Sequence, residues 1–123
     1  MDLQWREVTI PDSAPPVAVA RLRDEADGAY WALVRFPPGW SRPSTGHYPV
    51  DEEFWLLEGD LEMSGATYGP GSGARVAAGA PRSESRSTGG ALALARFAGP
   101  PRWVRDATSP VPPPWRGRWP ARA

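Results

Sequence analysis

Short apolar segments, separated by proline, glycine and aspartate, recur along the whole chain. Helical periodicity is weak, because no stretch of about 12 residues keeps apolar residues at helical spacing without a glycine or a proline. The apolar segments instead have the length and the boundaries of β-strands. They span residues 5–10, 17–23, 29–36, 53–58, 60–63, 74–78, 91–97 and 103–104. These short strands, with turn signals between them, predict an all-β antiparallel fold, a sandwich or a barrel.

Two of the predicted strands are apolar on both faces. In 29–36 every residue but one is apolar, and 53–58 alternates apolar residues between its two sides. In the second segment the two sides carry Phe54 and Leu56, and Trp55 and Leu57. One side belongs in the core, so the other needs a second layer or a second subunit to cover it. We therefore expect a homodimer.

Composition narrows the functional classes. The chain has 123 residues, the size of one domain, and no cysteine, which excludes disulfides, thiolate ligands and a cysteine nucleophile. Its 14 basic residues, all arginine, balance 14 acidic ones, so no basic nucleic-acid-binding surface is expected. The sequence has neither a secretory signal nor an apolar run near the roughly 18 residues of a membrane span. We expect a cytoplasmic protein that binds neither nucleic acid nor membrane.

The last third of the chain differs in charge from the rest. Residues 1–81 carry 6 arginines and 12 acidic residues, whereas residues 82–123 carry 8 and 2. Opposite charges favour docking of the C-terminal part on the rest of the chain, with contacts between subunits as the alternative. The segment 108–123 has no strand or helix period, and its three consecutive prolines favour an extended conformation. We predict a domain over 1–107 and a docked Pro/Trp/Arg-rich tail over 108–123.

One spaced set of residues carries most of the chemical information. Gly39 is followed by five residues and Thr45, one residue and His47, four residues and Glu52, and six residues and Gly59. This spacing resembles the first motif of the cupin superfamily, in which a glycine, two histidines, a glutamate and a second glycine are so arranged. The first histidine is replaced here by Thr45. With a three-residue spacing before the glutamate, the second histidine position would instead fall at Tyr48.

A second segment resembles the second cupin motif. Gly71 is followed by five residues and Ala77, one residue and Gly79, and two residues and Arg82. The family has proline and histidine where this chain has Ala77 and Arg82. The resemblance covers about residues 28–98 and is greatest to small single-domain cupins of the anti-sigma-factor type. It implies a single cupin β-barrel, a double-stranded β-helix of the jelly-roll type.

The resemblance also implies a degenerate metal site. In cupins the motif residues point into the barrel and hold a divalent metal. Only His47 and Glu52 are of ligand type here, because Thr45 is a poor ligand and Arg82 is a fixed cation that repels a metal. We therefore expect no cofactor, with a divalent metal on His47 and Glu52 as the weaker alternative.

The same residues can form a site without a metal. His47, the single histidine, and Glu52 are the predicted acid–base pair. Arg82, with Thr45 and with Trp40 at the barrel mouth, is predicted to bind the substrate, and its guanidinium can clamp an anionic oxygen. Strand-end placement suggests that Arg82 is partly solvated. The alternative is a buried ion pair between Arg82 and Glu52, which would fill the former metal site.

Three functions remain open. The first is a metal-independent isomerase, cyclase or lyase that acts on a small molecule inside the barrel. The second is a non-catalytic ligand-binding protein or sensor, and the third is a metal-dependent oxygenase or isomerase with an irregular ligand set. Sequence alone does not separate the first two, because a binding pocket and an active site differ only in what happens to the ligand.

Overall fold

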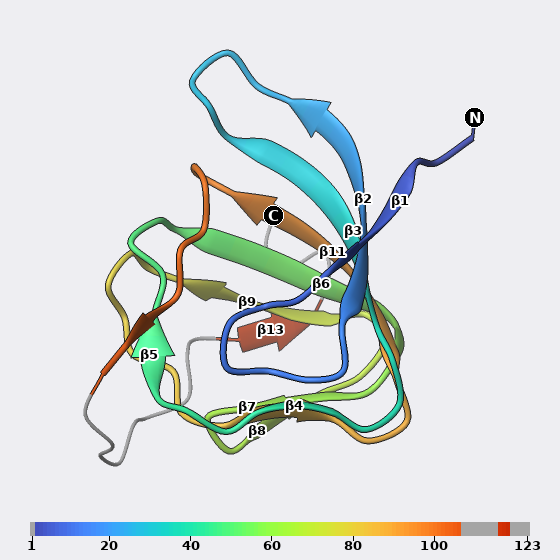
Figure 1. Ribbon diagram of the computed structural model, residues 1–123, viewed down its shortest axis with the longest axis vertical. Helices are drawn as coiled ribbons and strands as arrows, with labels where there is room; N and C mark the ends of the chain where they lie inside the picture. Colours follow the sequence, from blue (N-terminus) through green and yellow to red (C-terminus); the bar gives the residue numbers. More distant parts are fainter. Residues whose placement is uncertain (1, 107–115, 119–123) are drawn as a thin grey trace.

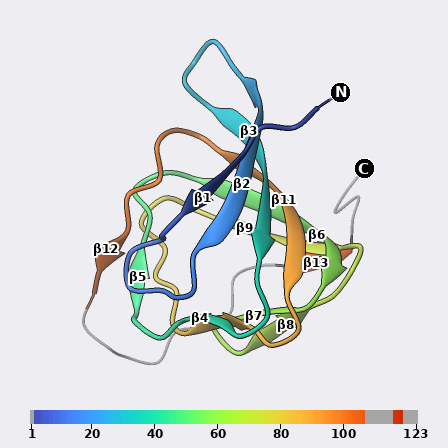
Figure 2. The ribbon, with the colours of Figure 1, turned by 45° about the vertical axis from the view of Figure 1, so that its right-hand side comes forward.

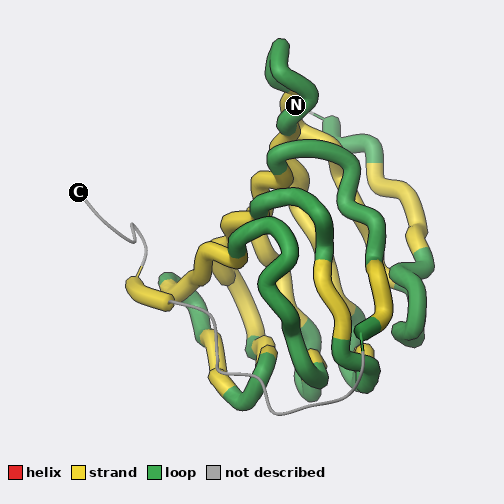
Figure 3. Tube along the Cα trace, turned by 90° about the vertical axis from the view of Figure 1, so that its left-hand side faces the viewer, coloured by secondary structure: helices red, strands yellow, loops and turns green. Residues whose placement is uncertain are grey.

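The protein folds as two facing antiparallel sheets with a short third sheet at one end (Figure 1). The computed structural model describes residues 2–106 and 116–118. Over these residues it contains strands and loops and no helix, as the tube in Figure 3 shows. The predicted all-β class is therefore confirmed. No helix in the described part of the chain is long and apolar enough to cross a membrane.

Each sheet joins strands that are distant in sequence. The large sheet, in spatial order, contains β1 (Trp5–Val8), β2 (Val17–Asp24), β3 (Tyr30–Phe36), β11 (Ala91–Phe97), β6 (Glu52–Gly59), β9 (Ser72–Val76) and β13 (Arg116–Arg118). The small sheet contains β4 (Trp40–Arg42), β10 (Ser85–Ser87), β7 (Leu61–Met63) and β8 (Ala66–Tyr68). The third sheet pairs β12 (Val104–Arg105) with β5 (Gly46–His47). This is a jelly-roll arrangement, and among the described residues the strands pair as separate sheets rather than as one closed ring.

All eight segments predicted as strands contain a strand. The segments that were not predicted are β4, β5, β8, β10 and β13, each of two or three residues. So few residues do not display an alternation, and several of these strands contain serine, arginine or glycine. Their pairing is decided by the neighbouring strand rather than by their own composition.

The hydrophobic core lies between the large and the small sheet. Inward residues alternate along the strands of both sheets, as in β6, where Phe54 and Leu56 are buried. Tyr68 of β8 is completely buried and meets the Phe54 ring edge-on at 5.2 Å. The core thus joins the two sheets through large side chains, and the candidate site lies beside it.

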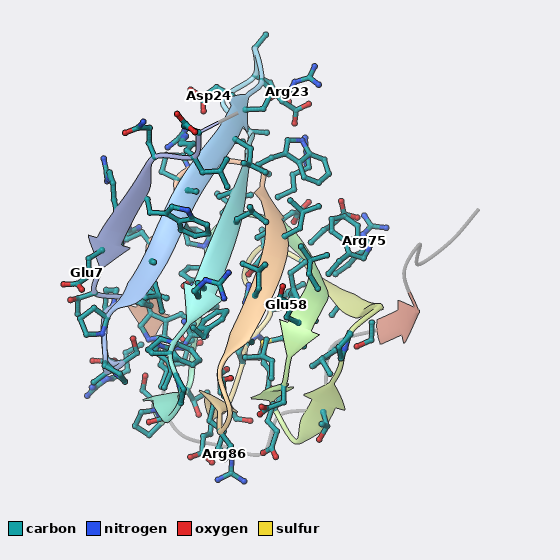
Figure 4. The ribbon with its side chains drawn as sticks, turned by 90° about the vertical axis from the view of Figure 1, so that its right-hand side faces the viewer. Glu7, Arg23, Asp24, Glu58, Arg75 and Arg86 are labelled. Carbon is teal, nitrogen blue, oxygen red and sulfur yellow. The ribbon has the colours of Figure 1, made fainter. Side chains whose placement is uncertain are left out.

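The opposite face of the large sheet carries apolar side chains in register. One row crosses five adjacent strands, and we call it the outer apolar row: Trp5, Ala20, Leu33, Leu94 and Trp55. Trp31 stacks beside this row on Trp55, with ring centroids 5.8 Å apart. Figure 4 views the large sheet with its side chains, including the charged Glu58 of β6 and Arg75 of β9.

The turn that closes β6 requires a glycine. Gly59 has a φ of +84°, a conformation that side chains rarely adopt. A Cβ at this position would also collide with the backbone of Gly90. Gly59 therefore makes the turn between β6 and β7 possible.

Part of the C-terminal segment pairs with the large sheet. The backbone of β13 runs antiparallel to β9, with Gly117 opposite Gly73. The rest of the predicted tail, including Trp115 and Trp119, lies outside the described residues. The boundary at 107 and the docking of the whole tail stay predictions.

Candidate functional site

A cavity of about 70 Å³ lies between the two main sheets. Most of its wall is apolar and comes from the core. Its polar lining is formed by Arg42, Tyr48, Glu52, Arg82 and Ser85. Charged side chains in an apolar wall are costly to bury unless they serve a partner or a ligand, so this cluster is the candidate site.

Glu52 and Arg82 form a buried ion pair inside the cavity. Arg82 Nη1 lies 2.6 Å from Glu52 Oε1, and the side chains are 4% and 10% exposed. Glu52 begins β6 and points inward with Phe54, whereas Arg82 is held by a backbone bridge to Gly46. The ion-pair alternative is therefore confirmed, and the expectation of a partly solvated Arg82 is wrong. The backbone bridge to Gly46 holds Arg82 in the interior, so its side chain is buried rather than partly exposed.

The ion pair leaves several polar atoms unsatisfied. Glu52 Oε1 and Arg82 Nη1 are close, but their geometry is not that of a hydrogen bond. Arg82 Nε and Nη2 and Ser85 Oγ have no hydrogen-bond partner among the described residues. Nε and Nη2 form one edge of the planar guanidinium, the edge that matches a carboxylate.

Arg42 is a second buried cation, which the sequence analysis missed. It is 3% exposed, and its Nη1 donates to the Tyr48 hydroxyl over 3.1 Å. Its guanidinium carbon lies 3.7 Å from the centroid of the Trp103 ring. Burial lowers the pKa of Arg42 from its usual value, because the charged form loses its hydration. The one available signal was its position two residues after the apolar Trp40, on the same side of the short strand β4.

Tyr48, rather than His47, lines the cavity. Its ring lies under Arg82, with the guanidinium carbon 4.7 Å from the centroid, and its hydroxyl accepts the hydrogen bond from Arg42. In this part of the chain Gly46 and Tyr48 are buried, and His47 points the other way. Tyr48, which is separated from Glu52 by three residues as in the alternative spacing of the motif, therefore occupies the position that faces the cavity, and His47 does not.

His47 is held at the edge of the fold by Asp106. Its Nδ1 lies 2.8 Å from Asp106 Oδ2, and the two side chains are partly exposed. His47 is not among the residues that line the cavity, so the structure does not bring the two predicted acid–base residues together there. Thr45 is also outside the lining, although it is buried, and its carbonyl accepts a hydrogen bond from the Asp106 amide.

Residues 103–106 form a strap beside the cavity. Its strand β12 pairs with β5, as Figure 2 shows. Trp103, near the start of the strap, contacts Arg42 and Tyr48 and donates a hydrogen bond from Nε1 to Ser44. Arg105, further along, pairs with Asp12. The strap thus packs, through Trp103, against Arg42 and Tyr48.

Trp40 lines the cavity as a buried residue. It is 2% exposed, packs against Phe36 with ring centroids 4.6 Å apart, and donates from Nε1 to Ser13. It was expected at the mouth of a barrel. The structure places it in the wall, where it contributes shape rather than a solvent-exposed contact.

The donors of the cavity do not fit a divalent metal. Glu52 is the one carboxylate in the lining, and the fixed charges of Arg42 and Arg82 repel a cation. In the described ranges no group of three or more histidine, cysteine, aspartate or glutamate side chains converges on one point. The weaker alternative of a metal on His47 and Glu52 gains no support from this arrangement.

Comparison with known proteins rests on structure. No protein-family model and no curated protein matches the sequence. The polyketide cyclase RemF from Streptomyces resistomycificus has a TM-score of 0.71 and 19% identity, over 88% of this chain and 82% of its own. A chain of the Rhodobacter sphaeroides SigE complex with the anti-sigma ChrR has a TM-score of 0.63 and 19% identity, over 78% and 50%.

A third solved structure has a cupin-like fold. It is a protein of unknown function from Ralstonia eutropha, with a TM-score of 0.60 and 12% identity over 73% of this chain and 64% of its own. This chain has the cupin fold. The cupin resemblance of the sequence is thereby confirmed at the level of the fold. Acetylacetone dioxygenase and oxalate decarboxylase structures are also similar to this cupin fold.

Proposed function

We propose that this cupin-fold protein binds a small molecule between its sheets and catalyses an isomerase-, cyclase- or lyase-type reaction by acid–base chemistry. The observation that carries the proposal is the buried Glu52–Arg82 pair in the cavity wall. A polyketide cyclase among the structural neighbours supports this reaction class. The proposal includes a degenerate metal site, because the cavity donors are those of an anion site and not of a metal site.

Three residues have proposed roles in the reaction. Glu52 accepts or returns a proton, because its carboxylate lines the cavity and has an unsatisfied oxygen. Arg82 orients a negatively polarised oxygen of the substrate through its unpaired edge. His47 remains the predicted second acid–base residue, and it would act on a part of the substrate that reaches the strap.

A non-catalytic sensor is the second candidate. The similarity to a chain of a complex with an anti-sigma protein favours it, because ligand binding alone would then be the function. A metal-dependent oxygenase or isomerase is the third, supported by the dioxygenase neighbours but opposed by the two arginines of the cavity.

Analysis of co-purified ligand tests the first two candidates. We expect denatured wild-type protein to release a small molecule that the Glu52→Gln/Arg82→Met double variant does not retain. Fresh ligand incubated with native protein should be converted, as followed by mass spectrometry. Binding without conversion would reject the enzyme in favour of the sensor.

Metal analysis tests the third candidate. We expect plasma mass spectrometry of the purified protein to find well under one equivalent of transition metal. Stoichiometric zinc, iron, manganese or nickel that is lost in His47→Ala would support the metal-dependent reaction and reject the proposed metal-independent reaction.

We also propose a cytoplasmic homodimer that contacts neither nucleic acid nor membrane. The outer apolar row and the Trp31–Trp55 stack support the dimer, because they lie on the side of the large sheet away from the core. The balanced charge supports the absence of a nucleic-acid partner.

A further inference from the structure

We infer that the cavity is a binding site for a carboxylate group, held between the unpaired edge of Arg82 and Nε of Arg42. The inference rests on the proposed function, since it names the ligand class of the same site. It would make a small monocarboxylate, or the carboxylate end of a longer molecule, the ligand.

The charge of the cavity requires an anion. Its wall contains two guanidinium groups and one carboxylate, so it carries one excess positive charge. Arg42 has no acidic partner within ion-pair distance among the described residues, and its contacts are a neutral hydroxyl and two aromatic rings. A buried cation without a counter-charge is unfavourable, and a monoanion would balance it.

Unsatisfied donors belong to residues that line the same cavity. Both guanidinium groups lie against the ring of Tyr48, with their central carbons 4.7 Å and 5.6 Å from its centroid for Arg82 and Arg42. The donors without a partner in the described structure are Arg82 Nε and Nη2 and Arg42 Nε, with the Ser85 hydroxyl beside them in the lining. Buried donors are rarely left unpaired in folded proteins, so these atoms indicate a missing acceptor.

The shape of the donors selects a carboxylate. Nε and Nη2 of one arginine donate in parallel and match the two oxygens of a planar carboxylate. The cavity of about 70 Å³ holds a few non-hydrogen atoms, given that one water occupies about 30 Å³ in the liquid. Acetate is therefore a suitable probe.

Titration with small anions at constant ionic strength tests the site. Acetate and butyrate are the carboxylate probes, acetamide is the neutral analogue, and chloride and nitrate are the inorganic anions. We expect saturable stabilisation by acetate in thermal melts and saturable binding in calorimetry, with no effect of acetamide. Tighter binding of butyrate would identify the carboxylate end of a longer ligand, and tighter binding of acetate a small free carboxylate.

Matched arginine variants assign the binding to the cavity. Arg42→Met should weaken acetate binding by about tenfold or more, because a buried charge partner is lost. Arg86→Met, an exposed arginine of the small sheet, should leave it unchanged. Should Arg42→Met not fold, ¹⁵N spectra of the wild-type arginine side chains provide the second measurement. Acetate, and not acetamide, should then shift the Nε signals of two solvent-protected arginines.

Other results would overturn the inference. Equal saturable effects of chloride, nitrate and acetate would exclude a site selective for carboxylate. The absence of any saturable effect, or an unchanged affinity in Arg42→Met, would exclude the cavity as an anion site. A neutral co-purified ligand that the protein converts would reject this inference and leave the proposed function intact.

Discussion

The two buried arginines differ in how the protein compensates their charge. Arg82 has Glu52 at 2.6 Å, whereas Arg42 has the hydroxyl of Tyr48 and the face of Trp103. Removing one partner of a buried ion pair costs more than the pair contributes, because the other charge remains uncompensated. Removing a neutral hydrogen-bond partner lowers the free energy of unfolding by less than removing one partner of a buried ion pair. The residue-scale predictions follow from this difference.

Arg82→Ala should reduce the free energy of unfolding by about 3–5 kcal/mol, since it leaves the Glu52 carboxylate buried and alone. The double variant Glu52→Gln/Arg82→Met should recover much of that loss. Urea denaturation measures both. Arg86→Ala, whose exposed ion pair with Glu62 contributes little, is the matched control. A wild-type midpoint for Arg82→Ala would contradict the stabilising role of the pair.

Tyr48→Phe should destabilise the protein by about 1–3 kcal/mol, because it leaves the Nη1 donor of Arg42 buried without an acceptor. The edge-on ring contacts with Trp103 and Phe97 would remain. Chemical denaturation gives the difference. Stability equal to that of wild type would mean that water or a ligand already satisfies Arg42.

The strap packs against two of the residues that line the cavity. Trp103 packs against Tyr48 and Arg42, and the following backbone pairs with β5. Its close approach depends on Gly46, because a Cβ there would meet the Trp103 ring and the Val104 carbonyl. The same glycine bridges to Arg82, so one residue positions both the strap and a charged group of the cavity.

Gly46→Ala should displace the strap and cost about 1–3 kcal/mol, the usual range for an added methyl group in a packed site. Hydrogen exchange should become faster at the Asp106 amide, which donates to Thr45 in the wild type. Gly69→Ala is the matched control, because a Cβ there has open space. Unchanged protection at Asp106 in Gly46→Ala would contradict the packing argument.

At the scale of the whole molecule, the two faces of the large sheet differ in what covers them. The small sheet covers the inner face, whereas on the other face Trp5 of the outer apolar row is 41% exposed. Ion pairs such as Arg35–Glu58 and Arg75–Glu53 flank this row. An apolar centre with a charged margin is the usual composition of a subunit interface.

Light scattering at micromolar concentration should therefore give about twice the chain mass of 13.4 kDa. Leu33→Glu should shift the protein to the monomer, since it places a charge in the centre of the row. Arg86→Ala, on the small sheet, should remain dimeric. A monomeric wild-type protein would contradict the proposed interface.

Much of the fold was predictable because its main strands are long apolar segments with turn residues at their ends. The strands β2, β3, β6 and β11 have seven or eight residues each, and proline, glycine or aspartate lies at or near their ends. The positions of Glu52 and Gly59 followed from the resemblance to the first cupin motif. The short strands of the small sheet carry no such pattern, because their pairing depends on neighbours that are distant in the sequence.

The composition of the candidate site was less predictable from the sequence than the fold was, because it depends more on tertiary structure. The resemblance to the two cupin motifs placed Glu52 and Arg82 in one site, but it left open whether His47 or Tyr48 joins them. That choice is a one-residue difference in register, which reverses the direction of every side chain in a strand. The position of Arg42 was also decided only by folding, because a three-residue strand and the distant Trp103 together bury its charge.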